Sequence, residues 1–146
     1  DFFITLLILV ILMVVYNIQP SIQAFFLPFY ILLLFFAAFG ISIYITALNV
    51  KYRDFRYIIP FIIQLGIYIS PVGFSTERIV EKTGNEFQDL LYLNPLVGII
   101  DGFRWCIINQ PLYLRGQIIS IFIIILFCLI GIRYFRKTEK SFADNI

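Results

Sequence analysis

The stretch NVKYRDFR, residues 49–56, decides how the rest of the chain is interpreted. It contains the first charged side chains after the N-terminal residue, which are Lys51, Arg53, Asp54 and Arg56. A charged side chain is costly at the centre of a bilayer, so these residues must lie outside the hydrocarbon. Because apolar sequence flanks the stretch on both sides, we predict a loop at one membrane face. Three cations against one anion indicate that this face is cytoplasmic.

The composition of the chain is that of a membrane protein. Of its 146 residues 61% are hydrophobic and 14% are charged, and the mean hydropathy is +0.94. A soluble domain could not cover its surface with so few polar groups. We therefore predict an all-α, polytopic helical membrane protein with no domain boundary between residues 1 and 146. Outside the membrane flanks there is no basic stripe, so no nucleic-acid partner is expected.

Four segments are predicted to span the membrane, at about residues 1–18, 22–48, 57–74 and 116–133. The first would reach only ~26 Å of a hydrocarbon core that is ~30 Å thick, so we expect its helix to continue upstream. The last ends in a second basic flank, residues 133–140, which an even number of spans places on the cytoplasmic side. In the second segment Ala38, Ser42 and Thr46 form a small-residue stripe that predicts close approach of another helix.

The third segment carries a mixed aromatic and polar face. Phe61, Gln64 and Tyr68 share that face by their helical spacing. An amide in contact with lipid would lose its hydrogen bonds to water, so Gln64 should contact a neighbouring helix or line a wet pathway. The three residues are therefore candidates for a cargo path, with plain helix packing as the alternative.

Residues 75–116 differ from the cytoplasmic segments in charge. They contain five acids and four bases, whereas residues 49–56 and 133–140 together contain seven cations. This balance predicts that residues 75–116 lie on the outer side. The acids between residues 77 and 89 would also suit a membrane glycosyltransferase, but they lie among bases in a solvated stretch, which favours a surface role.

A re-entrant or interfacial helical hairpin is predicted at about residues 87–109. Asn94 followed by Pro95 is a helix-start signal, and the helix after it would reach ~20 Å, too short to span. Its candidate residues for an outer gate are Asn94, Pro95, Gly98, Asp101, Gly102, Arg104 and Trp105. The two glycines leave room for another helix, the acid and the arginine can pair, and the tryptophan suits a membrane interface. A rigid anchor that never moves is the alternative.

Several kinds of chemistry have no residues to support them. The chain has no histidine, no zinc-binding cysteine spacing, no phosphate-binding loop and no hydrolase triad. Its two cysteines, Cys106 and Cys128, are expected to be buried thiols without a disulfide. We therefore predict no cofactor and no enzymatic activity.

Three blocks of sequence resemble a known family. They are ALNVKYRD (47–54) with IPF (59–61) and SPV (70–72); NPLVG (94–98) with IDGFRW (100–105); and FRKTEKSFADNI (135–146). In this order they resemble the permease subunits of type 2 ABC transporters of the polysaccharide and polyol phosphate exporter family. These permeases export O-antigen of lipopolysaccharide, capsule or teichoic acid. The resemblance covers essentially the whole chain.

The resemblance implies a multi-pass permease in the cytoplasmic (inner) membrane of a bacterium or archaeon. Such permeases have six spans, pair as homodimers and bind two separate ATP-binding subunits, so this chain would be the C-terminal part, spans three to six. Residues Lys51, Arg53, Asp54 and Arg56 are then candidates for the ATPase-side loop, or for a loop that contacts only lipid headgroups. The expected cargo is a polysaccharide, with a lipid or drug exporter of the same fold as the alternative.

Overall fold

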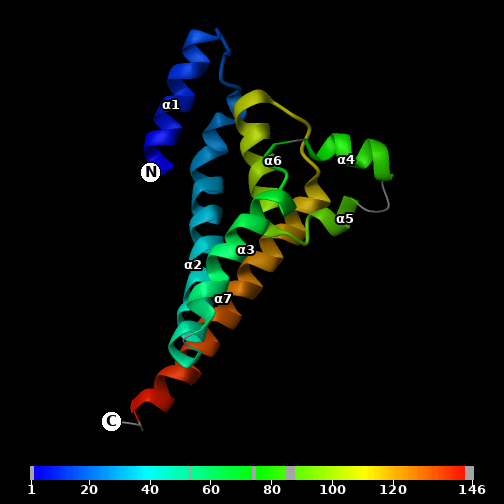
Figure 1. Cartoon of the computed structure of the whole chain (residues 1–146). Coiled ribbons are helices and arrows are strands. Elements are labelled where there is room, and N and C mark those ends of the chain that lie inside the picture. Colours follow the sequence, from blue (N-terminus) through cyan, green and yellow to red (C-terminus); the bar gives the residue numbers. More distant parts are fainter. Residues whose placement is uncertain (1, 53, 74, 85–87, 144–146) are drawn as a thin grey trace.

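The computed structural model describes residues 2–52, 54–73, 75–84 and 88–143, and within these ranges every regular element is helical (Figure 1). The elements in chain order are α1 (Phe2–Val15), η1 (Ile22–Phe26), α2 (Leu27–Lys51), α3 (Phe55–Ile69), α4 (Thr76–Thr83), α5 (Gln88–Leu91), α6 (Pro95–Ile108) and α7 (Leu114–Ala143). The predicted all-α fold is therefore confirmed for the described part of the chain.

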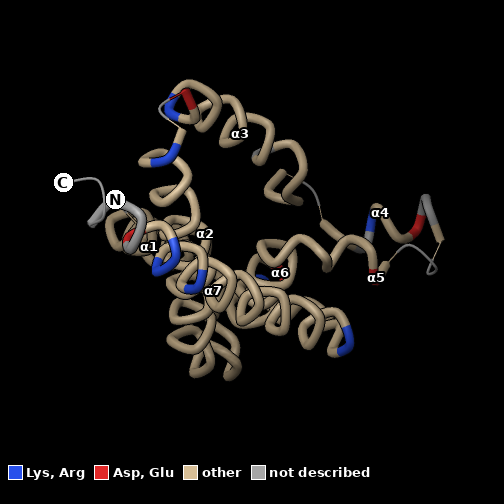
Figure 2. Tube along the Cα trace, turned by 90° about the horizontal axis from the view of Figure 1, so that it is seen from below, with Lys and Arg blue, Asp and Glu red and all other residues tan. Residues whose placement is uncertain are grey.

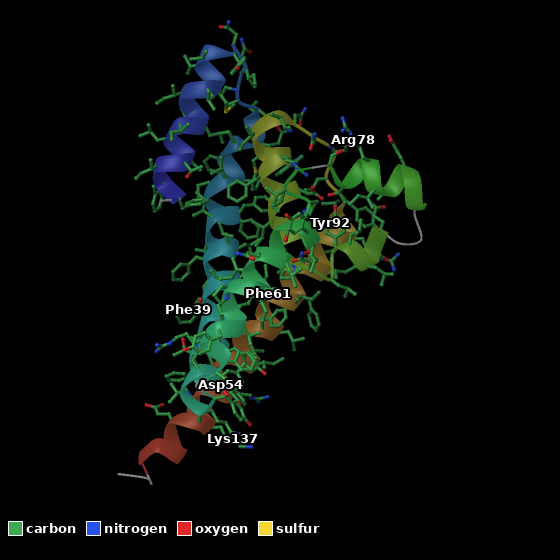
Figure 3. All side chains as sticks on the ribbon, viewed as in Figure 1. Phe39, Asp54, Phe61, Arg78, Tyr92 and Lys137 are labelled. Atoms are coloured by element: carbon green, nitrogen blue, oxygen red, sulfur yellow. The ribbon has the colours of Figure 1, made fainter. Side chains whose placement is uncertain are left out.

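The long helices run up and down between two ends of the molecule (Figure 1). Helix α2 descends to the end where α3 begins, and α7 descends to the same end. Helices α4, α5 and α6 lie toward the opposite end. Figure 3 accordingly shows Asp54 and Lys137 near one end and Arg78 and Tyr92 nearer the other. The two basic segments that the sequence assigns to one membrane face thus lie together.

Among the described residues two helices are long and apolar enough to cross a membrane, Ile22–Lys51, which includes η1, and Leu114–Glu139. Phe2–Val15 and Phe55–Gly66 are shorter apolar helices. Helix α3 ends at Ile69, because the residue before a proline disfavours helical backbone and Ser70, which precedes Pro71, is extended with ψ 137°. The predicted span to residue 74 is therefore helical only to residue 69.

Helices α2 and α7 pack along much of their length, and their closest approach is at glycine. A Cβ atom on Gly131 would lie 2.5 Å from the carbonyl oxygen of Gly40, and one on Gly40 would lie 2.9 Å from the backbone nitrogen of Cys128. Side chains at these two positions would force the backbones apart. The thiol of Cys128 donates to the Phe36 carbonyl oxygen at 3.1 Å, which adds a side-chain contact at the same crossing.

The small-residue stripe predicted on α2 does not face the buried core of this chain, so close approach of another helix to it stays a prediction. Ala38, Ser42 and Thr46 are exposed, whereas the small residues that α2 buries are Ala37, Gly40 and Ala47. Helix α2 is apolar on every side, so its sequence indicates no preferred face. The face that α7 contacts is decided instead by where the two backbones can approach most closely.

The buried core lies where α2, α6 and α7 meet. It consists of Tyr30, Leu33, Ala37, Ile99, Cys106 and Ile124, with Leu96, Phe103 and Trp105 packed partly against it. Cys106 is 0% exposed, and both cysteines are free thiols, as predicted. Helix α6 therefore contributes to the core as an integral third helix, which fixes the position of the residues that it carries.

Helices α1 and α3 stand apart from this core. No side chain of α1 is buried, and none of the described side chains of α3 is buried. Figure 2 shows α3 joined to α2 at one end and arching away from α6 and α7. The two short apolar helices thus expose on all sides residues that need a membrane or a partner around them.

Candidate functional site

The hairpin at α5 and α6 begins with the predicted cap. The side chain of Asn94 accepts from the Leu96 backbone N–H at 3.1 Å, and Pro95 occupies the first helical turn, so this prediction is confirmed. The amide nitrogen of Asn94 also donates to the Ser70 hydroxyl at 3.2 Å. Ser70 is buried just after the end of α3. One side chain therefore starts α6 and attaches it to the residue that terminates α3.

Asp101 is the centre of a polar cluster on α6. One of its carboxylate oxygens accepts from the Thr76 hydroxyl at 2.6 Å and from the Tyr92 hydroxyl at 2.9 Å. The other oxygen pairs with Arg104 at 3.4 Å, which confirms the predicted pairing of these two residues. Thr76 and Tyr92 are both buried. The carboxylate is thus neutralised and hydrogen-bonded, as a half-buried charge must be.

Arg104 extends the cluster to the segment that follows α3. Its second guanidinium nitrogen donates to the Pro71 carbonyl oxygen at 2.8 Å and to the Val72 carbonyl oxygen at 3.3 Å. Together with the bond between Asn94 and Ser70, these contacts bind the end of α3 to α6 at two places. Any displacement of α6 must therefore break them or carry the end of α3 along.

The two glycines of α6 lie where other helices approach. A Cβ atom on Gly98 would collide with Ser120 of α7, and one on Gly102 would collide with the ring of Tyr30 on α2. The close packing predicted for this spacing is therefore present. Trp105 lies half-buried with its ring centroid 5.5 Å from that of Phe26, beside η1.

The aromatic and polar face of α3 is exposed in the described part of the chain. Phe61 and Tyr68 are 68% and 80% exposed, and Gln64 is also exposed. Among the described residues no hydrogen-bond partner for the Gln64 amide is found. An interhelical bond within this chain, one of the two readings of Gln64, is therefore absent from the described structure, and the face is left open to a membrane, a wet pathway or another subunit.

The basic loop, residues 49–56, is also largely exposed in its described part. Lys51 lies over the Tyr52 ring, 5.2 Å from its centroid, while Arg53 lies outside the described residues. Asp54 occupies the N-cap position of α3 without forming a side-chain cap bond, and both it and Arg56 are exposed.

An open hollow of about 640 Å³ lies beside the basic loop and is lined by Asn49, Val50, Asp54, Arg56 and Tyr57. In the described part of the chain the buried oxygen of the Asn49 amide has no hydrogen-bond partner. The exposed charges of Asp54 and Arg56, the hollow and the unpaired Asn49 oxygen therefore lie together at this end of the molecule. Within the same ranges, no three His, Cys, Asp or Glu side chains gather closely enough to hold a metal ion.

Comparison with protein families decides what kind of molecule carries these features. The family model described as ABC-2 type transporter matches residues 1–108, which is most of the chain and includes the basic loop, α3 and α6. The chain belongs to the ABC-2 type transporter family. The family predicted from the residues is confirmed, and the apolar helices are those of a membrane protein of this family.

Two curated relatives within this family are similar along nearly the whole chain. Both are named O-antigen export system permease protein RfbA, from Klebsiella pneumoniae. One is 27% identical over 144 residues and the other 29% identical over 146, in each case 98% of this chain and 54% of the relative. The chain therefore spans about half the length of the curated relatives it matches. No solved structure matches this ABC-2 transporter chain.

Sequence reasoning missed the partners of the hairpin. The Gln117 amide donates to the Gly98 carbonyl oxygen at 2.9 Å, and the Ser120 hydroxyl donates to the Tyr92 carbonyl oxygen at 3.1 Å. Both donors are buried on α7. Residues 116–132 of α7 are otherwise apolar, so two polar residues three positions apart there signal a shared polar contact. That signal would have indicated this face of α7.

Proposed function

We propose that this chain is the C-terminal part of a permease that exports a polysaccharide across the cytoplasmic membrane. The cargo class is a glycan of the O-antigen, capsular or teichoic-acid type. The energy comes from ATP hydrolysis in a separate ATP-binding subunit, and two copies of the permease form the conduit. The observation that carries the proposal is similarity over 98% of this chain to two permeases named for O-antigen export.

The open face of α3 supports the cargo assignment. A glycan in transit needs surfaces that contact its C–H faces without holding it, and hydrogen-bonding groups that replace water. Phe61, Gln64 and Tyr68 offer both on one face that no other helix of this chain covers. In the proposed permease this face lines the cargo path, with the second copy completing the opposite wall.

The basic loop supports a contact with the ATP-binding subunit. Charged groups that bond within their own chain are unavailable to a partner, whereas Asp54 and Arg56 have no ion pair among the described residues. The hollow beside them can accept a protruding side chain. We assign residues 49–56 to this interface. Alanine at Arg53 and Asp54 in the complete permease should weaken association with the ATP-binding subunit or uncouple ATP hydrolysis from export.

The α5–α6 hairpin is assigned to the outer end of the path. A gate must be able to form and break its contacts with the neighbouring segment. The bonds of α6 to Ser70, Pro71 and Val72 are few and polar, which suits such contacts. A crosslink at Gly98 is ruled out as a test, because a side chain there would collide with Ser120. Cysteines at Ser70 and Asn94 are suitable instead. A short reducible crosslinker between them should block export until it is reduced, and full export with the crosslink intact would make the hairpin an anchor.

Export itself is tested in the host organism. Deletion of the complete permease gene should abolish cell-surface glycan while glycan in lysates persists, and the wild-type gene should restore it. A drug or lipid exporter would leave surface glycan unchanged on deletion, which would contradict the proposal.

The cargo path is tested by Tyr68→Ala, with Tyr16→Ala as the matched control because Tyr16 is an equally exposed tyrosine on the turn after α1. Tyr68→Ala should lower surface glycan at an unchanged amount of folded permease. Equal export by the two variants would remove Tyr68 from the cargo path.

A further inference from the structure

A cavity of about 270 Å³ lies beside the hairpin cluster. Its walls come from the start of α4, from α5, from α6 and from the segment that joins α6 to α7, residues 109–113. It lies on the side of the molecule where α4 and α5 are found, away from the basic loop (Figure 1). In volume it is slightly smaller than a typical small-molecule pocket, so it suits a single ring-sized ligand.

The polar residues that line this cavity are two glutamines, four hydroxyl residues (Ser75, Thr76, Tyr92 and Tyr113) and the hydrogen-bonded carboxylate of Asp101. Gln88 and Gln110 line it, each half-buried, and neither side chain has a hydrogen-bond partner in the described part of the chain. Each amide has two N–H donors and one carbonyl acceptor. A hydroxyl group can accept from the donors or donate to the acceptor. Both glutamines therefore keep hydrogen-bonding capacity that the described part of the chain does not use.

The apolar part of the wall is flat. The ring of Tyr113, whose centroid is 5.5 Å from that of Tyr92, adjoins Pro111 and Leu112 in the lining. Aromatic and proline rings are surfaces on which the C–H face of a pyranose can lie. The cavity therefore combines a flat apolar wall with amides that converge on one small volume.

The charges around the cavity are already paired. Asp101 is bonded to Arg104, Thr76 and Tyr92, and Asp89 is paired with Arg115 at 3.2 Å. Asp89 also accepts from the Tyr113 hydroxyl at 2.9 Å. This bond raises the pKa of Tyr113. Among the described lining residues the charged side chain is Asp101, which is paired with Arg104, so the cavity favours a neutral ligand over an anion or a cation.

We propose that this cavity binds one neutral sugar ring of the exported glycan at the outer end of the path. The inference rests on the proposed export function and adds a binding site to it. Gln88 and Gln110 hold the ring hydroxyls, and Tyr113 with Pro111 contacts one flat face of the ring. A charged sugar such as a uronic acid is disfavoured, because the described lining of the cavity contains no cationic side chain.

The test uses the complete permease in lipid nanodiscs and saturation-transfer NMR with a panel of methyl hexopyranosides. At least one neutral glycoside should receive saturation at millimolar concentration. Sorbitol, which has hydroxyls but no rigid face, and methyl glucuronide, which is charged, should receive less. Gln88→Ala with Gln110→Ala should weaken binding at least about fivefold, the effect of losing one net hydrogen bond. Gln110→Ala alone, in a non-helical segment, should act in the same direction.

The matched control is Gln19→Ala, which removes an exposed amide from the turn before η1 and should leave binding unchanged. Absence of saturation for every neutral glycoside, or equal binding by wild type and the double variant, would overturn the inference. If the wild-type permease exports glycan in cells under those outcomes, the export function stands and only the sugar site fails. If deletion of the gene leaves surface glycan intact, the export function itself fails.

Discussion

The α5–α6 hairpin and helix α3 are bonded to each other at Ser70, yet they differ in where their polar and aromatic groups find partners. In the hairpin, Asp101, Asn94 and Arg104 are all hydrogen-bonded within the chain, and the glycines lie against α2 and α7. On α3 and the basic loop, the corresponding groups are exposed. The α5–α6 hairpin is thus stabilised by contacts within this chain, whereas the groups on α3 and in the basic loop are accessible to other molecules.

This contrast has an energetic meaning. Removing a group from the hairpin leaves its buried partners unsatisfied, so the cost appears in the stability of the subunit. Removing a group from the open face of α3 leaves nothing unsatisfied within the chain, so the cost should appear only in transport or assembly. Substitutions in the two regions can therefore be told apart by measuring folding and export separately.

The largest expected effect is at Asp101. Asp101→Ala removes the carboxylate that Arg104, Thr76 and Tyr92 share. Breaking a buried ion pair costs about 3–5 kcal/mol, and the lower end is expected because Arg104 keeps its bonds to Pro71 and Val72. Reversible unfolding of the permease in detergent measures the loss. Glu81→Ala, at an exposed position on α4, is the control and should stay within about 0.5 kcal/mol of wild type. Similar losses in both variants would mean that the hairpin cluster stabilises nothing.

A smaller effect is expected at the crossing of α2 and α7. Gly40→Val places side-chain atoms against the backbone of Cys128, and overpacking of this kind costs about 1–3 kcal/mol. The matched glycine is Gly66 on α3, where an added Cβ atom meets nothing within 4 Å. Gly66→Ala should be neutral or stabilise by up to about 1 kcal/mol, because alanine is the better helix former. Thermal unfolding of both variants checks the pair, and destabilisation by Gly66→Ala would show that α3 packs against another part of the molecule.

The next expected effect is on the reactivity of the Cys106 thiol. Burial raises the pKa of the Cys106 thiol, and the thiolate is the form that reacts. With Cys128 replaced by alanine, maleimide should label Cys106 at least about tenfold more slowly than a cysteine placed at Tyr68. Its rate should keep rising with pH beyond the point where an ordinary thiol is fully ionised. Equal rates in the native protein would mean that the core around α6 opens readily.

The smallest effect on stability is expected in the basic loop. Asp54→Ala should change the free energy of unfolding by less than about 0.5 kcal/mol, because the side chain is exposed and forms no cap bond. Its effect should appear instead in co-purification with the ATP-binding subunit. A clear loss of stability with unchanged co-purification would assign Asp54 to the fold of α3.

Local patterns predicted the parts of the hairpin that depend on neighbours in sequence. The cap at Asn94 and the pair of Asp101 with Arg104 follow from spacing along one helix, which is why both were predictable. Thr76 and Ser70 are more than 20 residues from their partners, so only the packed arrangement brings them together. Nothing in their local sequence indicates it.

The membrane environment limits prediction in a second way. A uniformly apolar helix such as α2 has no polar side to exclude from the core, so periodicity does not indicate which face packs. Because such helices are uniformly apolar, the boundaries of the membrane-spanning segments can be predicted only from the composition of the sequence. The basic flanks were the more informative feature, because charge is costly in hydrocarbon wherever it lies in the helix.

The position of Arg104 has a mechanical consequence. The carboxyl end of a helix carries about half a negative charge from its aligned peptide dipoles, and a cation beside that end is attracted to it. Arg104 lies there, bonded to the two carbonyls just after α3, whereas the described residues at the amino end of α3 provide the chain connection to α2 and no side-chain cap bond. We therefore expect α3 to behave as a lever hinged at Ile69. A push on the basic loop would swing Phe55 widely, and the hinge would pass only a small rotation to α6.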